Sequence, residues 1–385
     1  MKMKTTTMKM VLGSFAVSLA FGALADDPAV SQVTARQRWP WSRLVDIDYV
    51  LACDQGQSVD VVVQAYTRNT ALPLPDSSLT GDLYGVSYGA RHIVWDPTVT
   101  AYTNNGVLPE FRVALTPTTS PLYMIVDLTK SVGADGQIEY IYQGDARLET
   151  YGRFTNVWFG VTNDSVYATD KLVLRRIRAG TFGMGYNATL STTLTKEFYA
   201  GVFEVTASQW QRITTGTGGT SLLAKNSVSY NDIRGATNDT PSINWYATGS
   251  AVMPTGFLGL IRTKTGIGSF DLPTEAQWEY ICRATTTSYY SDGESASSSD
   301  TNVLNRLGWY TDNSGGLVHA VGCKEANAWG LYDMHGNVFE WCLDWYADSL
   351  SGGSNPSGAV SGSARVFRGG CWAYPASSCC SAARD

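Results

Sequence analysis

Apolar and polar positions alternate in short runs over residues 26–128. The clearest runs are 59–66 and 122–128, and turn-forming stretches such as 74–78 and 103–106 separate them. A period of two is typical of strands with one buried face, and turns at short intervals favour an antiparallel sandwich. We therefore predict an all-β sandwich over residues 26–128, an accessory domain without a catalytic signature.

Residues 129–170 have a less regular pattern. Aromatic and β-branched residues, as in 140–142 and 156–161, are too frequent for a disordered linker. We predict a connecting segment with additional strands. A new strand pattern at 171–177 then opens a second domain, residues 171–385.

Two short helices are predicted in the second domain. Thr206 and Gln209 have the spacing of a capping box, in which the first and fourth residues close the helix start, and Thr274 and Gln277 repeat it. In both cases a tryptophan follows the glutamine and an isoleucine comes three residues later, which indicates one buried face. The polar tracts that follow, 214–221 and 285–301, predict surface loops.

The N-terminus predicts a secretory signal peptide. Lysines 2, 4 and 9 precede an apolar run at 11–23, and small residues stand before a cleavage position after Ala25. The run is shorter than the roughly 20 residues that span a bilayer. The expected location is therefore the periplasm, the cell surface or the medium, with no transmembrane segment after cleavage.

Length and charge narrow the class of protein. The 385 residues suggest two domains, and removal of three lysines with the signal peptide would take the formal charge from -6 to -9. An acidic protein of this kind is a poor partner for nucleic acid. The chain has three histidines and no paired Cys or His at zinc spacing, so His92 is predicted to be a strand residue and His335 an exposed turn residue.

Seven cysteines remain after signal cleavage, at positions 53, 282, 323, 342, 371, 379 and 380. An oxidising compartment would let some pair, and the odd number leaves one over. Neighbouring Cα atoms are about 3.8 Å apart, closer than disulfides prefer, so Cys379 and Cys380 are expected to have different fates. One of them is a candidate partner for Cys282 or Cys342.

Three segments carry a family resemblance: GLYDMHGNVFEWCLDWY at 330–346, RVFRGGCW at 365–372 and LPTEAQWEYICRA at 272–284. They resemble the sulfatase-modifying-factor family, whose namesake is the formylglycine-generating enzyme. The resemblance implies that residues 171–385 form a compact, irregular α+β domain related to C-type lectins. The predicted fold class is thus α+β, an N-terminal β-sandwich followed by a domain of this kind.

The resemblance also implies a calcium site. Asp333 and Glu340 flank the turn, and carboxylates with turn carbonyls are the hard oxygen ligands that Ca²⁺ prefers. By position, the family's structural calcium would be held by the side chains of Asp333 and Glu340 and the carbonyls of Gly336 and Val338.

The family's catalytic segment departs here. The family enzyme binds Cu(I) through two cysteines five positions apart that follow Gly-Gly-Ser, and soft thiolates select that ion. In this chain Cys379 stands at the second position and Tyr374 at the first, while Cys371 replaces the serine. Cys371 is the candidate for a replacement thiolate, so Cys371 and Cys379 are the candidate catalytic residues and Cys379 the candidate copper ligand.

Three interpretations remain open at this point. The domain could be a binding or accessory module for a protein or glycan ligand, a sulfatase among them. Alternatively, it could be an oxidase that converts a sulfatase cysteine to formylglycine. A third possibility is an inactive remnant, because the sequence ends at Asp385 where the family continues with a further strand, so that the domain is expected to be truncated.

Overall fold

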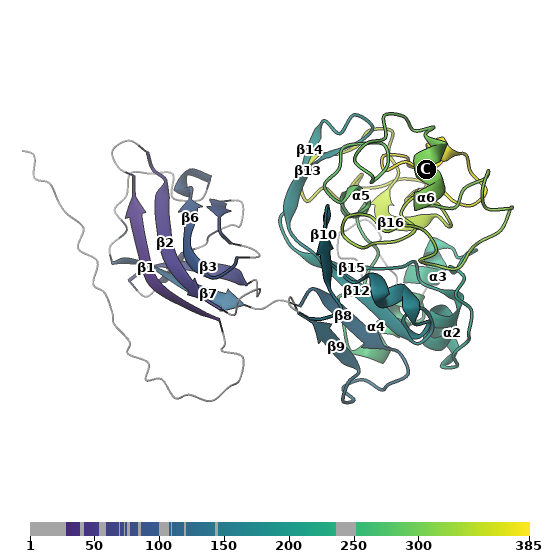
Figure 1. The fold of residues 1–385 in the computed structure, drawn as a ribbon, viewed down its shortest axis with the longest axis horizontal. Helices are drawn as coiled ribbons and strands as arrows, with labels where there is room; N and C mark the ends of the chain where they lie inside the picture. Colours follow the sequence, from purple (N-terminus) through teal and green to yellow (C-terminus); the bar gives the residue numbers. More distant parts are fainter. Residues whose placement is uncertain are drawn as a thin grey trace, which may run out of the picture. The chain divides into compact units, whose positions relative to one another are not determined.

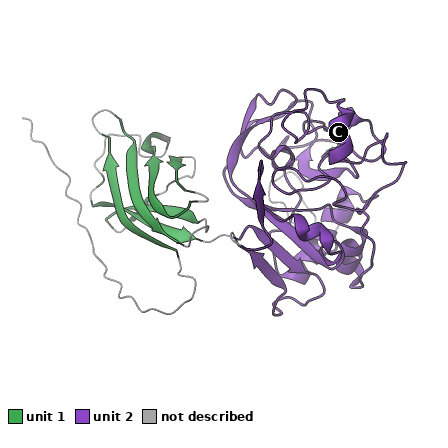
Figure 2. Cartoon of the chain, viewed as in Figure 1, with its two compact units in different colours: residues 1–120 green, residues 121–385 purple. Residues whose placement is uncertain are grey.

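The chain forms two compact units, residues 1–120 and 121–385 (Figures 1 and 2). The computed structural model describes residues 28–38, 42–53, 59–68, 70–72, 74, 78–83, 86–99, 108, 110–118, 121–142, 145–235 and 252–385. The predicted signal peptide, residues 1–25, lies outside the described residues.

The first unit is a sandwich of two antiparallel sheets. One sheet has the order β1 (Ala29–Gln37), β2 (Val45–Ala52), β6 (Gly89–Trp95), β5 (Leu79–Gly81), and the other has the order β4 (Thr70–Leu72), β3 (Asp60–Thr67), β7 (Phe111–Thr118). Ile47 and Ile93 of the first sheet pack with Val61 of the second in one buried cluster. The predicted β-sandwich is confirmed.

His92 lies in a strand of this unit, as predicted. It pairs with Asp48 across β2 and β6, and its Nδ1 atom lies 2.7 Å from the Asp48 carboxylate. Its Nε2 atom lies 3.2 Å from Asp46. His92 therefore bridges two carboxylates on the face of the sheet.

The second unit begins earlier than the sequence predicted. β8 (Tyr123–Asp127) and β9 (Ile138–Ile141) belong to the sheet β15-β12-β8-β9, with β12 (Lys171–Ile177) and β15 (Phe198–Gly201). The run at 122–128 is buried on both faces of β8, so it pairs with the equally apolar β12 and not with the sandwich. The boundary thus falls at 120, and the segment 129–170 is part of the second unit.

The remaining elements of the second unit are short. The other strands are β10 (Glu149–Tyr151), β11 (Phe154–Val157), β13 (Gly180–Met184), β14 (Leu190–Leu194), β16 (Glu340–Trp345), β17 (Gly353–Ser354) and β18 (Arg365–Arg368). The helices are α1 (Val166–Thr169), α2 (Ala207–Thr215), α3 (Tyr230–Arg234), α4 (Phe257–Thr265), α5 (Glu275–Arg283) and α6 (Thr301–Leu307). The predicted mixed α+β class is confirmed. Among the described residues, no helix is long and apolar enough to cross a membrane.

Both predicted capping boxes are present. The side chains of Thr206 and Thr274 accept from the backbone N–H groups of Gln209 and Gln277, and each glutamine accepts in return from the threonine N–H. The Thr274 box begins α5, the helix on which the functional site is built.

The last residues of the sequence pair with β18. Arg384 bridges Arg368, and Phe367 exchanges backbone hydrogen bonds with Asp385 at 2.9 and 3.2 Å. Residues 384 and 385 thus lie along the edge of β18 that does not face β16.

Candidate functional site

A buried arginine–glutamate network, formed by Glu275, Glu279, Arg283, Arg368 and Arg384, joins α5 to β18. Arg368 lies 2.7 Å from Glu275 and 3.0 Å from Glu279, and Arg283 donates to Glu279 at 2.8 Å. Arg384, in the last segment of the sequence, donates to Glu275 at a distance of 2.6 Å. Because each buried charge has an opposite charge and further hydrogen bonds, the network fixes β18 and the turn that follows it.

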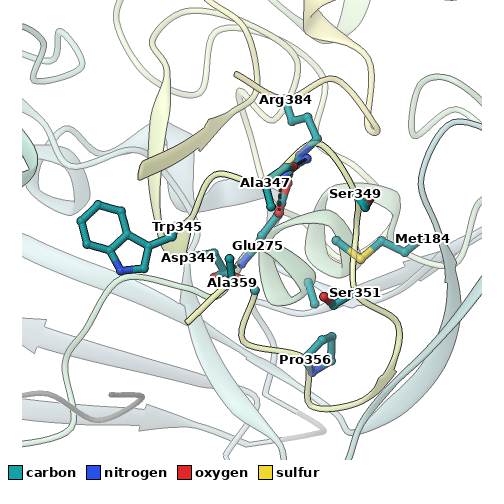
Figure 3. Close-up of a pocket in the computed structure, with 12 residues that line it drawn as sticks. Met184, Glu275, Asp344, Trp345, Ala347, Ser349, Ser351, Pro356, Ala359 and Arg384 are labelled. Carbon is teal, nitrogen blue, oxygen red and sulfur yellow. Dashed lines mark hydrogen bonds and ion pairs between the residues drawn. The ribbon is translucent and has the colours of Figure 1, made fainter. Parts of the chain in front are cut away.

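Figure 3 shows a small pocket next to this network. Glu275 and Arg384 line it together with Asp344, whose carboxylate accepts from the N–H of Glu275 at 2.8 Å. The cavity measures about 10 Å³, room for one water molecule. It is therefore part of the scaffold and too small for a substrate.

The Asp333 turn, residues 330–339, is built from unusual backbone angles. Asp333 and Asn337 have φ values of +59° and +65°, which aspartate and asparagine tolerate better than other non-glycine residues. Gly336 has φ +142°, and a Cβ there would lie 2.2 Å from the Trp309 carbonyl oxygen. The turn therefore packs backbone to backbone against residue 309, which requires glycine at 336.

Asn337 and Glu204 hold the Asp333 turn in place. Asn337 donates through Nδ2 to Glu204 at 2.7 Å, and the backbone N–H of Val338 donates to the same carboxylate at 3.0 Å. The Asn337 carbonyl accepts from the Trp372 N–H at 2.9 Å. This last bond connects the Asp333 turn to the segment that carries Cys371.

Three carboxylates lie in or beside the Asp333 turn, those of Glu204, Asp333 and Glu340, and burial and neighbouring charge shift their pKa values. Burial raises the pKa of Asp333 to about 6 and that of Glu340 to about 7. Burial, and then the charges of the other two, raise the pKa of Glu204 well above its ordinary value. A nearby cation would offset these unfavourable charges.

The Asp333 carboxylate has one unused oxygen. Oδ2 accepts from the Gly322 N–H at 2.7 Å, but Oδ1 is buried and has no hydrogen-bond partner among the described residues. Within the same residues, no three His, Cys, Asp or Glu side chains gather into a metal-binding group. The donors thus fit a Ca²⁺ ion that takes Asp333 and Glu340 side chains together with turn carbonyls, and not a site made of side chains alone.

The thiol turn, residues 369–380, follows β18 directly. Cys371 and Cys379 are both buried, and the Cys379 thiol lies near the backbone N–H of Cys371. Burial raises the pKa of Cys371, and it raises the pKa of Cys379 to about 12. The structure thus brings the two candidate catalytic cysteines together, as protonated thiols near neutral pH.

Tyr374 occupies the rim of the thiol turn. Its side chain is 43% exposed, and its ring contacts Phe339 edge-on with the ring centres 4.9 Å apart. Its backbone N–H donates to the Cys371 carbonyl at 3.0 Å. The Tyr374 ring therefore packs on Phe339 at the surface, and this position of the thiol turn carries a phenol.

His335 is buried, and the prediction of an exposed turn residue was wrong. It is 1% exposed, its Nδ1 atom lies 2.9 Å from the Cys379 carbonyl oxygen, and the Ser291 N–H donates to its Nε2 atom at 3.1 Å. Burial lowers the pKa of His335 to about 4, so the imidazole is neutral and donates through Nδ1. His335 therefore positions the backbone of Cys379.

Sequence reasoning missed two of these contacts. The tract 285–301 was predicted to be a surface loop, but Tyr290 and Ser291 are buried within it, and the Tyr290 ring meets His335 edge-on at 5.3 Å. Glu204 was not singled out at all. Its only signal in the sequence is an acidic residue within the apolar stretch 198–205.

A larger cavity of about 700 Å³ is lined by residues of β12, β15, α2 and α4, with Glu204 and Glu340 in its wall. Ile233 of α3 also lines it, and residues 236–251, which join α3 to α4, lie outside the described residues.

The family model described as "Sulfatase-modifying factor enzyme 1-like domain" matches residues 162–385, more than half of the chain. The chain belongs to this family.

Several named proteins are similar over shorter stretches. Serine/threonine-protein kinase pkn1 of Chlamydia caviae is 40% identical over 107 residues, which are 26% of this chain and 16% of that protein. Formylglycine-generating enzyme of Mycobacterium tuberculosis is 41% identical over 76 residues, 18% of this chain and 25% of the enzyme. The chain thus spans about a sixth to a quarter of the length of these two relatives.

Among solved structures, Treponema denticola variable protein 1 matches 56% of this chain and 89% of its own, with 26% identity and a TM-score of 0.41.

Proposed function

We propose that this protein is a secreted binding or accessory module, whose second unit keeps the family scaffold without a complete copper site. The observation that carries the proposal is Tyr374. Cu(I) sites of the family type need two thiolates in register, and a phenol is a hard oxygen donor that does not replace a soft one. The burial of Cys371 and Cys379, which keeps both protonated, also supports the proposal.

The test is Cu(I) titration of the reduced mature protein, followed in air by mass spectrometry of a sulfatase-type Cys-x-Pro-x-Arg peptide. We expect no stoichiometric copper binding and no conversion of the peptide cysteine to an aldehyde. Conversion by the wild-type protein would overturn the proposal and would make Cys371 and Cys379 the working pair of the alternative function, a formylglycine-generating oxidase.

A gain-of-function variant sharpens this test. Tyr374→Cys places a thiol at the family's first position, five residues before Cys379, and we expect it to bind one Cu(I) per chain. Tyr374→Ser is the matched control, because it removes the ring without adding a soft ligand. Equal copper binding by both variants would mean that the missing thiol is not what limits the site.

We also propose that the Asp333 turn holds a calcium ion with a structural role. The unpartnered Oδ1 atom of Asp333 supports this proposal, as does the proximity of Glu340. Calcium here would supply no chemistry. It would neutralise buried carboxylates and fix the turn that contacts the thiol turn through Asn337 and Trp372.

Exposed aromatic rings support a glycan as the bound partner, with a protein such as a sulfatase as the alternative. Tyr151 is 56% exposed and its ring lies within 5.5 Å of the rings of Phe154 and Phe159. Aromatic faces of this kind stack on sugar rings. In a glycan array, we expect Tyr151→Ala to lose signal, whereas Tyr88→Ala, an exposed tyrosine of the first unit, should keep it.

A further inference from the structure

The thiol turn contains three cysteines, and their sulfur atoms have different surroundings. The Cys371 thiol lies near the N–H groups of Ala373 and Tyr374, and the Cys371 carbonyl accepts from the Tyr374 N–H at 3.0 Å. The Cys379 thiol lies near the backbone N–H of Cys371. The sulfur of Cys379 therefore faces the residue that carries the other thiol.

Gly370 makes this approach possible. A Cβ at Gly370 would lie 2.5 Å from the Cys379 sulfur and 2.7 Å from the Ser378 carbonyl oxygen. Since real Cβ atoms do not approach so closely, the Cys379 thiol sits directly under the backbone of the residue before Cys371. The short helix Ala376–Cys379, which ends at this thiol, keeps it there.

Cys380 points to different partners. Its backbone carbonyl accepts from the Ala383 N–H at 3.0 Å, and its thiol lies near the Tyr186 hydroxyl. Its neighbour Cys379 shares none of these contacts. An adjacent pair is also poorly suited to disulfide geometry.

The remaining buried thiols of this unit have other neighbours. The Cys282 thiol donates to the Met334 carbonyl at 3.6 Å and lies 3.9 Å from His335 Nε2. The charges that act on Cys342 come from Arg368 and nearby carboxylates. These contacts of Cys282 and Cys342 thus include no other cysteine.

We propose that Cys371 and Cys379 form an intramolecular disulfide when the folded protein meets a disulfide oxidant such as oxidised glutathione. The Cys371 thiolate attacks a glutathione sulfur, the glutathione S–S bond breaks, and one glutathione leaves as a thiolate. The Cys379 thiolate then attacks the Cys371 sulfur and releases the second glutathione. The two protons lost by the protein thiols pass to the departing glutathiones, so two thiols are oxidised and one small disulfide is reduced.

The burial of the two thiols sets the order of these steps. Cys371 is 8% exposed and Cys379 is fully buried, so the oxidant reaches Cys371 first. The product has no thiolate at 371 or 379, so copper titration of an oxidised sample would report nothing about the reduced site.

The experiment equilibrates the full mature chain with a mixture of reduced and oxidised glutathione, blocks remaining thiols with N-ethylmaleimide and digests without reduction. Chymotrypsin cuts after Trp372 and so separates Cys371 from Cys379. We expect a pair of peptides joined between 371 and 379, with one maleimide on Cys380. Three maleimides on this segment, or a link that includes Cys380, would overturn the proposal.

Two variants complete the test. Cys380→Ser should leave the link between 371 and 379 unchanged, whereas Cys371→Ser should leave Cys379 and Cys380 both alkylated. A digest of Cys371→Ser in which Cys379 is still oxidised would mean that another thiol is its partner. The measurement needs no ligand, so its failure and the failure of the proposed binding function are separate results.

Discussion

The arginine–glutamate network and the thiol turn are neighbours in the chain but differ in how they are built. Arg368 is fully buried and contacts two glutamates and two backbone carbonyls. Tyr374, six positions later, rests one ring against Phe339 and leaves much of its side chain in water. The side chains of the network are 0–12% exposed, whereas Tyr374 at the rim of the thiol turn is 43% exposed.

This difference indicates which of the two regions tolerates substitution. Removing one partner of a buried ion pair leaves an uncompensated charge, so the network resists single changes. A residue at the open rim can be replaced with little loss of packing. Membership in the family therefore describes the scaffold of the second unit. Any chemistry of this unit depends on the residues at the rim of the thiol turn.

The strongest test of this comparison is Arg368→Met. It leaves Glu275 and Glu279 buried without their countercharge, and we expect a loss of about 3–5 kcal/mol in the free energy of unfolding, measured by urea denaturation. The matched control is Arg306→Met, which breaks an exposed ion pair with Glu325 and should cost about 0–1 kcal/mol. Equal losses would remove the distinction between closed and open regions.

The calcium proposal gives the next largest effect. Chelation by EDTA should lower the melting temperature, because an ion that binds only the folded state contributes about 2.7 kcal/mol at a hundred times its Kd. Asp333→Ala should abolish the difference between melts with calcium and with EDTA, whereas Asp312→Ala, at an exposed position, should preserve it. A wild-type melt that is the same in both buffers would rule out the site.

Contacts between residues close in the sequence could be predicted, and contacts between distant segments could not. The capping boxes at Thr206 and Thr274 were predictable because their partners lie three residues away. The burial of His335 was not, because its partners at 291 and 379 come from distant segments and no local pattern marks them. The same holds for Glu204, whose contacts lie more than 130 residues along the chain.

The domain boundary shows a second limit. The run 122–128 has strand character, and sequence alone could not say which sheet it joins. Its pairing with β12 depends on a match between two apolar strands that are separated by more than 40 residues. Local pattern therefore gave the type of element, and tertiary packing decided its partner.

Asp344, at the edge of the network, provides a test by pH. Burial raises its pKa to about 6, above the unfolded value near 4, so the native state favours the protonated carboxyl. Its contribution to stability is present below pH 4 and is lost as pH rises through 6. Since asparagine does not titrate, the stability of the wild type relative to Asp344→Asn should fall by roughly 2 kcal/mol between pH 4 and pH 7. Parallel stability curves would show that this carboxyl is not desolvated.

The smallest expected effect concerns the start of α5, which carries both glutamates of the network. Thr274→Ala removes the side-chain oxygen that accepts from the Gln277 N–H at 3.2 Å, and we expect a loss of about 1 kcal/mol in urea denaturation. Thr274→Ser keeps the hydroxyl and should cost only a few tenths as much. If the two variants were equally destabilised, packing of the threonine methyl group would matter more than the cap. The position of α5 against β18 would then depend on the buried ion pairs and not on its own first turn.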